Sequence, residues 1–225
     1  MAHLKRYGIP KFWPLSKKEK VWAVTPRPGP HPKDFCIPLQ IIVRDILKLA
    51  ETSKEAKKII KAKNILVDKK SRTDPNFPCG LMDVIEIPEL KKYYRINVNK
   101  KGLYLEEIKK EDSDKKLCRI QNKTIVKRGL CQLNLHDGRN ILVKDSKKYK
   151  TSDSLLIQLP DQKILKHVPF KEGSNAIVFS GKNIGFTGKI KKIIPRKSML
   201  EDNKVILQTK EKEIETLKDY VFVIE

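Results

Sequence analysis

The chain has 225 residues, and its 49 Lys and Arg outnumber its 27 Asp and Glu, giving a formal net charge of +22. At roughly 100–200 residues per domain, this length allows one large domain or two to three small ones. No uncharged apolar run approaches the ~18 residues of a membrane span, and no apolar stretch typical of a signal peptide follows residues 1–6. We therefore expect neither a membrane nor a secreted protein, and place the chain in the cytoplasm.

Such a charge excess predicts an anionic partner, because the positive residues repel one another until something neutralises them. A polyphosphate backbone gains free energy by releasing its counterions to many Lys and Arg side chains. Two alternatives remain: a basic protein that is merely soluble, and an anionic membrane surface. The membrane surface is disfavoured, since it calls for a basic amphipathic helix whereas here the positive residues are spread along the chain.

The cysteines Cys36, Cys79, Cys118 and Cys131 are far apart in the sequence and form no C-x-x-C pair. Zinc sites need ligand pairs at short spacing, and a disulfide framework needs a denser pattern. We expect reduced, mostly buried thiols, with no metal site and no cofactor.

Residues 1–35 carry eight Lys and Arg against two acids, both tryptophans of the chain and a proline cluster at residues 26–32. Prolines at alternate positions exclude a helix or a central strand there, so this segment cannot build its own core. It is either a solvated tail or an arm that lies on another surface. Trp13 and Trp22 favour the arm, because large aromatic side chains are costly to leave in water.

Residues 36–87 predict a compact α+β unit. Apolar residues spaced three or four apart predict a helix over residues 39–50, and the capping box of Thr52 and Glu55 starts a second helix that runs through Ile60. Short strands follow at residues 65–67 and 84–87. The lysines of the second helix lie mostly on one side, although such a face is often only solvated.

From about residue 93 the apolar period changes to two, which predicts strands. Residues 132–143 read as a hairpin whose two-residue turn is Asp137-Gly138. Regularly spaced short strands favour one or two small barrels. The acidic end beyond residue 200 is expected to face solvent or a protein partner. The other strands are predicted at residues 94–98, 103–105, 117–120, 155–159, 176–179, 189–193, 205–208 and 220–224.

Catalysis has little support in the sequence. The histidines, at positions 3, 31, 136 and 167, lie in no nucleophile–base pattern, and the acids are scattered among lysines. Arg72-Thr73-Asp74 superficially resembles the Arg-x-Asp surroundings of pseudouridine synthases, but no catalytic domain follows it. The glycines of residues 173–190 form no phosphate-binding loop, since they lead into a strand. We expect no enzyme.

Several strings resemble a known family. Residues 36–87 are similar to the αL RNA-binding module, and residues 172–193 resemble the KOW motif of ribosomal and transcription-elongation proteins. With residues 26–32, 77–87, 132–140 and 149–151, the chain resembles the S4e family of ribosomal proteins nearly end to end, in its archaeal form. That resemblance implies an α+β, multidomain fold. Its parts are an extended amino-terminal arm (1–35), the αL module (36–90), a β-rich central domain (91–170) and a carboxy-terminal SH3-like KOW barrel (171–225).

The resemblance implies a structural constituent of the small ribosomal subunit that binds 16S-type rRNA and touches neighbouring small-subunit proteins, without a small-molecule substrate. A free-standing RNA-binding regulator or elongation-type factor is the alternative, and an RNA-modifying enzyme a distant third. The expected RNA-binding residues are Lys5, Arg6, Lys11, Trp13, Lys17, Lys18, Arg27 and His31 in the arm; Arg44, Lys48, Ser53, Lys54, Lys57, Lys58, Lys69 and Arg72 in the module; Lys127, Arg128, His136 and Arg139 around the hairpin; and Lys182 and Lys189 beside the KOW loop.

Overall fold

The computed structural model describes residues 3–126, 129–196, 198, 200–209 and 212–224. It divides into a first unit of residues 1–97, 102–116 and 159–161, and a second unit of residues 98–101, 117–158 and 162–225. The α-helices of the described residues lie in the first unit, and the second is built mainly of strands, with a short 3-10 helix at Lys218–Tyr220. A mixed α and β protein was predicted, and this is confirmed. Among the described residues, none of the helices has the length and apolar composition of a membrane span.

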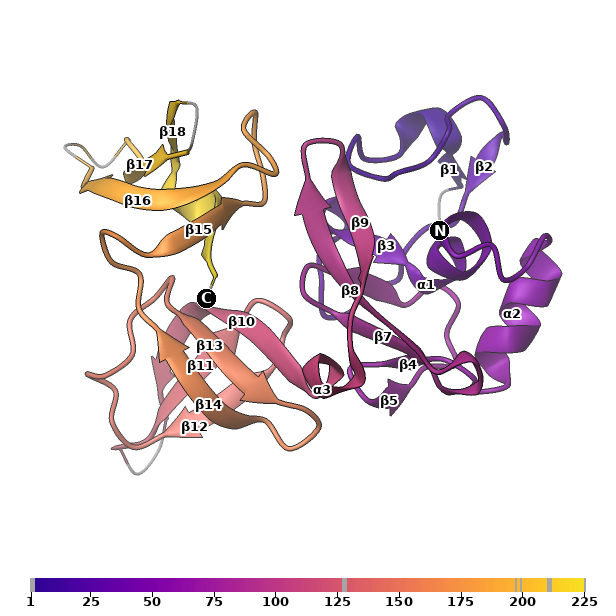
Figure 1. Ribbon diagram of the computed structural model, residues 1–225, viewed down its shortest axis with the longest axis horizontal. Helices are drawn as coiled ribbons and strands as arrows, with labels where there is room; N and C mark the ends of the chain where they lie inside the picture. Colours follow the sequence, from indigo (N-terminus) through magenta and orange to yellow (C-terminus); the bar gives the residue numbers. More distant parts are fainter. Residues whose placement is uncertain (1–2, 127–128, 197, 199, 210–211, 225) are drawn as a thin grey trace. The chain divides into compact units, whose positions relative to one another are not determined.

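The first unit is centred on an antiparallel sheet with the strand order β5-β4-β7-β8-β9 (Figure 1). A separate pair, β3 with β6, joins the segment before the helices to the segment before β7. The sequence had suggested a domain boundary at residue 90. In the structure β7, before this residue, pairs with β8, after it, so one sheet spans the boundary. The bounds are β3 (Cys36–Pro38), β4 (Leu66–Val67), β5 (Lys70–Ser71), β6 (Pro78–Gly80), β7 (Val84–Ile87), β8 (Lys92–Asn99), β9 (Gly102–Glu107) and the short α3 (Lys110–Ser113).

The first predicted helix is much shorter than residues 39–50. α1 (Leu39–Ile41) runs directly into a π-helical turn (Ile42–Ile46), and Lys48 then takes a positive φ of 53° that ends the helical path. The reason is packing, because Ile41, Ile42 and Val43 are all buried and the segment therefore has no single apolar face. The predicted extent of this amphipathic helix, residues 39–50, was wrong.

α2 (Ser53–Lys61) is the predicted second helix, and its capping box is confirmed. The Glu55 amide donates to Thr52 Oγ1 at 3.2 Å, and the Thr52 amide donates to Glu55 Oε2 at 3.3 Å. Hydrogen bonds from the Thr52 side chain and from the Thr52 and Glu51 amides to its carboxylate lower the pKa of Glu55. Ala56 and Ile60 are fully buried on the inner side, so the helix presents its lysines outward.

The amino-terminal arm is ordered by lying on the same unit. β1 (Leu4–Lys5) pairs with β2 (Trp22–Ala23), and the buried Trp13 donates its Nε1–H to the Cys36 carbonyl at 2.7 Å. His31 covers Gly80 so closely that a Cβ there would lie 2.3 Å from the His31 Cγ. The arm thus has no core of its own, as expected.

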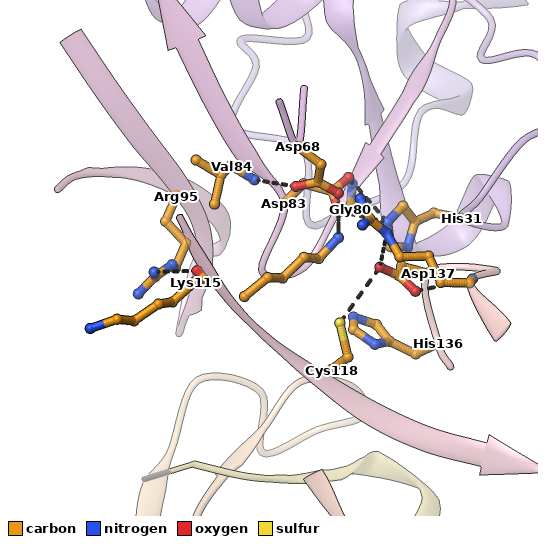
Figure 2. A network of polar contacts seen from close by, with 12 residues as sticks. His31, Asp68, Gly80, Asp83, Val84, Arg95, Lys115, Cys118, His136 and Asp137 are labelled. Carbon is orange, nitrogen blue, oxygen red and sulfur yellow. Dashed lines mark hydrogen bonds and ion pairs between the residues drawn. The ribbon is translucent and has the colours of Figure 1, made fainter. Parts of the chain in front are cut away.

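A buried ion cluster links the arm, the module and the start of β10 (Lys115–Ile125). Lys116 is fully buried, and its Nζ lies 2.6 Å from both Asp68 Oδ2 and Asp83 Oδ1. His31 Nε2 lies 3.1 Å from the Asp83 carboxylate (Figure 2). Burial by itself would raise the pKa of Asp83, but His31 and Lys116 hold it far below its usual value. Three segments distant in sequence therefore depend on one set of charges.

The second unit contains two sheets. β10 lies at the centre of the first, whose order is β12-β11-β10-β13-β14, and β16 at the centre of the other, whose order is β18-β17-β16-β15-β19 (Figure 1). The second sheet has its own apolar core, formed by residues such as Val178, Ile190 and Leu207. The bounds are β11 (Cys131–Leu135), β12 (Asn140–Val143), β13 (Ser154–Gln158), β14 (Lys163–Val168), β15 (Asn175–Val178), β16 (Thr187–Ile194), β17 (Lys204–Gln208), β18 (Glu213–Leu217) and β19 (Val221–Val223).

The predicted hairpin at residues 132–143 is confirmed, but its turn differs from the prediction. The Leu135 amide donates to the Arg139 carbonyl at 2.9 Å, which leaves a loop of three residues, 136–138. Only Gly138 of that loop has a positive φ, of 75°, as in a turn closed by a glycine bulge. The other predicted strands are also present, and β14 and β18 are among those that were missed, because each has few apolar residues from which a period could be read.

Replacing Lys116 by Met tests the ion cluster. Removal of the ammonium leaves Asp68 and Asp83 as buried charges without it, so we expect the free energy of unfolding to fall by about 3–5 kcal/mol. Denaturant unfolding measures this, with Lys115→Met as the control, because Lys115 is the exposed neighbour on the same strand. Equal stability of the two variants would contradict the assignment.

Candidate nucleic-acid interface

The clearest basic surface of the chain is the outer face of α2, which we call the α2 lysine face. It consists of Lys54, Lys57, Lys58 and Lys61, all exposed. Within the described residues, none of these four ammonium groups forms an ion pair, so their charges remain uncompensated. Glu55 is the one acid of the helix, and its carboxylate is engaged in the capping box.

Residues next to this helix have more local partners. The Ser53 hydroxyl accepts a short hydrogen bond from Gln40 Nε2, which ties the start of α2 to the buried α1. Arg44 Nη2 lies 2.7 Å from Asp45 Oδ2, so much of its charge is balanced within the π-helical turn. Lys48 is exposed at the end of that turn. The exposed charge of the predicted module surface thus comes mainly from lysines, whereas Arg44 and Ser53 are engaged by neighbouring side chains.

The chemistry of this face suits phosphate. The first turn of a helix carries partial positive charge, and lysines are mobile point charges that neutralise phosphates without selecting a base. Phosphate contacts position a protein on RNA, and folded RNA is recognised largely by shape and backbone. The α2 lysine face can therefore bind an RNA backbone.

The arm divides into exposed and buried residues. Lys5, Lys11, Lys17 and Lys18 are exposed, and Arg27 is exposed while lying 3.2 Å from Asp74 Oδ2 through its Nη1.

Three predicted arm residues are buried in the fold. Arg6 is 1% exposed and lies 3.5 Å from Glu19 through Nη2; Trp13 is 3% exposed; and His31 is 5% exposed beside Asp83. Their side chains hold the arm on the first unit and do not face an external RNA. Each of these residues has a partner or a contact that the sequence alone does not reveal.

Lys69 and Arg72 are also built into the fold. Lys69 Nζ lies 2.6 Å from Asp114 Oδ1 and 2.8 Å from Glu86 Oε1. Burial opposes the charge of Lys69, but hydrogen bonds to the two carboxylates raise its pKa on balance. The Arg72 guanidinium lies 4.3 Å from the centre of the Phe77 ring. Both cations stabilise the module more directly than they extend the α2 lysine face.

The hairpin tip is organised by Asp137. Its Oδ2 lies 3.0 Å from Arg139 Nε and accepts from Cys118 Sγ at 3.5 Å (Figure 2). His136 Nδ1 accepts from the Arg119 amide at 3.2 Å. Cys118, His136 and Asp137 converge within 4.8 Å, a spacing that metal ligands can have and that the sequence did not suggest. Because these hydrogen bonds use their polar atoms, we interpret the cluster as the support of the tip.

The remaining predicted residues lie in or beyond the strands of the second unit. Lys182 and Lys189 are exposed, on the loop before β16 and on β16 itself. Lys127 and Arg128 lie outside the described residues. The exposed acids of β18 face basic neighbours, since Glu215 Oε1 lies 2.9 Å from Lys204 Nζ and Glu213 pairs with Lys191.

A further basic loop was missed. Lys144, Lys147, Lys148 and Lys150 are exposed in the connection between β12 and β13. Lys123 on β10 fixes the backbone of this loop, because its Nζ donates to the Tyr149 carbonyl at 2.7 Å and to the Ser146 carbonyl at 3.1 Å. The signal was present in the sequence as four lysines within seven residues, next to the string at residues 149–151.

The cysteines behave as expected. Cys36, Cys79, Cys118 and Cys131 all belong to the described residues, are buried and form no disulfide. Burial raises the pKa of the Cys36 thiol to about 12, with smaller contributions from Asp83 and Asp34, so this thiol is inert at neutral pH.

Comparison with known proteins decides the family. The RS4NT domain matches residues 2–34, the S4 domain residues 37–85, and ribosomal family S4e residues 90–164. Small ribosomal subunit protein eS4 of Ignicoccus hospitalis is 47% identical over 231 residues, covering 99% of this chain and 91% of that protein. The chain belongs to the eS4 family. The resemblance noted in the sequence is therefore confirmed.

Other eS4 proteins are similar along nearly their whole length. That of Methanothermobacter thermautotrophicus is 45% identical over 223 residues, covering 99% of this chain and 91% of the relative. The crystal structure of 30S ribosomal protein S4e from Thermoplasma acidophilum has a TM-score of 0.72 and 33% identity, covering 85% of this chain and 96% of that one. The eS4 family thus accounts for both sequence and fold.

Replacing His31 by Ala separates a structural role from RNA contact. We expect the free energy of unfolding to fall by about 1–3 kcal/mol, because buried Asp83 loses a hydrogen-bond partner. The salt dependence of rRNA binding should stay unchanged, as measured by affinity between 50 and 200 mM salt. As a control, Lys11→Gln should leave stability unchanged and reduce the salt slope by about 0.7–0.9 if Lys11 contacts one phosphate. A shallower slope with unaltered stability for His31→Ala would restore His31 as an RNA contact.

Proposed function

We propose that this chain is a structural constituent of the small ribosomal subunit that binds 16S-type rRNA and stabilises its folded form during translation. The observation that carries the proposal is the α2 lysine face, four exposed and uncompensated cations on a capped helix of an eS4-family chain. Its partners are then small-subunit rRNA and neighbouring small-subunit proteins, and its location is the cytoplasmic ribosome.

The chain would act by neutralising phosphates where RNA helices approach one another. The sequence contains many lysines and only nine arginines. Lysine suits backbone neutralisation, whereas arginine is the residue of bidentate base reading. The exposed lysines of the arm, of α2, of residues 144–150 and of the KOW region would each add a modest phosphate contact. Roughly 6–10 such contacts would make binding fall ~10³–10⁵-fold between 50 and 200 mM salt.

We further propose four functional parts: the arm (1–35), the αL module (36–90), whose sheet β8 and β9 extend, the central β domain (91–170) to which those two strands lead, and an SH3-like KOW barrel (171–225). The antiparallel order β18-β17-β16-β15-β19 and its separate apolar core support the barrel. The connection between β14, which ends at Val168, and β15, which begins at Asn175, supports a domain boundary near residue 170.

The proposed role is non-catalytic. The Arg-x-Asp triplet, the one string that suggested a modifying enzyme, is engaged in the fold. Arg72 stacks on Phe77, and Asp74 accepts from Arg27 and from the Asn76 amide at 3.0 Å through Oδ1. Such contacts turn these side chains toward the protein.

The triple variant Lys54→Glu, Lys57→Glu, Lys58→Glu tests the proposal. Because these side chains are exposed, folding should be unaffected, whereas rRNA affinity should fall at least tenfold and the salt slope should decrease by about 2–3, at 0.7–0.9 per lost phosphate contact. Filter binding to archaeal 16S rRNA and co-sedimentation with reconstituted small subunits measure this.

The matched control is Lys92→Glu, Lys109→Glu, Lys110→Glu, which changes net charge equally at exposed positions of the same unit. It should weaken binding much less than the α2 triple. If both triple variants lost the same amount of rRNA affinity, the α2 lysine face would contribute only through the net charge of the protein. A chain that stays at the top of the gradient while subunits assemble without it would contradict the ribosomal role and favour a free-standing RNA-binding factor.

A further inference from the structure

The second unit has a pocket that the α2 lysine face does not explain. Its volume is about 760 Å³, within the range of sites that hold a small molecule. It opens on the face of the β15–β17 strands beside the loop that leads into β16. Its main side chains are Lys100, Asn175, Phe186, Thr187, Lys189 and Gln208.

Two glycines line this pocket where backbone segments approach closely. At Gly188 a Cβ would lie 2.5 Å from the Gln208 carbonyl oxygen, so the β16 backbone is pressed against β17. Gly185 has a φ of +78°, and a Cβ there would lie 2.2 Å from the Asn99 carbonyl carbon. A side chain at either position would be strained or would displace the wall of the pocket.

An aromatic ring and two cations lie at one side. Lys100 Nζ is 4.8 Å and Lys212 Nζ 4.7 Å from the centre of the partly exposed Phe186 ring. Lysine ammonium groups this close to a ring interact with its π face. A planar group that stacks on this ring would take the place of one ammonium group, and both lysines would then be available to its phosphate.

Polar side chains form a row at the other side. Asn175 on β15 is directly opposite Lys189 on β16, which is directly opposite Gln208 on β17, so all three lie on the same face of the sheet. Both amides are exposed, and their side chains hydrogen bond to no other residue that the structure describes. Glu213 is next in the row, but it pairs with Lys191. No acid lines the pocket in the described part of the chain.

These three components match the three parts of a nucleotide. A ring such as Phe186 stacks on a base, an Asn or Gln amide offers a donor and an acceptor to a base edge, and lysines bind the phosphate. We propose that this pocket binds one unstacked nucleotide of single-stranded RNA. Because bases within a duplex remain stacked, the ligand is a loop, bulge or strand end. The inference deepens the proposed function and rests on it for the choice of RNA as partner.

The test compares Phe186→Leu with Phe186→Tyr in the full chain. Leu keeps an apolar side chain of similar size without a π face, whereas Tyr keeps the ring. The probes are a single-stranded heptaribonucleotide of mixed sequence, the same sequence as a blunt duplex, and adenosine monophosphate, each titrated at 50 mM salt. Amide chemical shifts of Gly185 and Gly188 report local binding, and unfolding curves check that the variants are folded.

We expect the wild type to bind the single strand more tightly than the duplex and than the mononucleotide, with shifts at both glycines. Phe186→Leu should weaken single-strand binding by roughly 5- to 150-fold, the range expected for loss of one base–aromatic stack, and Phe186→Tyr should keep it within about threefold. Asn175→Ala should weaken it without changing the salt slope, since an amide carries no charge.

Equal binding of strand and duplex, or identical affinities of the Leu and Tyr variants, would overturn the proposal. Binding of the mononucleotide as tightly as the strand would make this a free-nucleotide site and would also overturn it. The outcome is separable from the proposed function. If the pocket variants bind the single strand as the wild type does while the α2 triple variant binds rRNA more weakly, only the pocket assignment fails. If the α2 triple variant also binds rRNA with normal affinity, both proposals fail.

Discussion

The buried charges around Lys116 are the constraint on which the first unit depends. One ammonium, fully removed from water, serves two carboxylates, while His31 reaches one of them from the arm. Taking so many charges out of water is favourable only when every partner is in place. The arm, the β4–β5 turn, the segment before β7 and the start of β10 must therefore come together, and this fixes the platform from which α2 presents its lysines.

Two groups of cations among the described residues have different roles. Arg6, Lys69 and Lys116 have acidic partners within the protein and are half-buried or fully buried. The lysines of α2 and of residues 144–150 are exposed. The first group gives the fold its specificity, and the second gives it the net charge that an RNA backbone can neutralise. A positive charge alone therefore does not identify the residues that are available to bind RNA.

The sequence predicts well wherever the determinant is local. The Thr52–Glu55 capping box placed α2, and the apolar alternation placed most strands. It failed where the determinant is distant: His31 meets Asp83, which is 52 residues away, and Trp13 meets Cys36, which is 23 away. The short first helix is a related case, because burial on all sides removes the one-faced pattern. Of the candidate interface, the α2 lysines were predictable, while the Lys144–Lys150 loop and the Phe186 pocket depend on how strands and turns assemble.

Lysine acetylation followed by mass spectrometry, on the free chain and on the chain in assembled small subunits, tests most directly whether buried cations build the fold while exposed ones bind RNA. The account predicts that Lys54, Lys57 and Lys58 react in the free chain and are protected in the subunit, and that Lys116 is unreactive in both. Lysines of α2 that stay equally reactive in the subunit, or a Lys116 that reacts in the folded free chain, would contradict it.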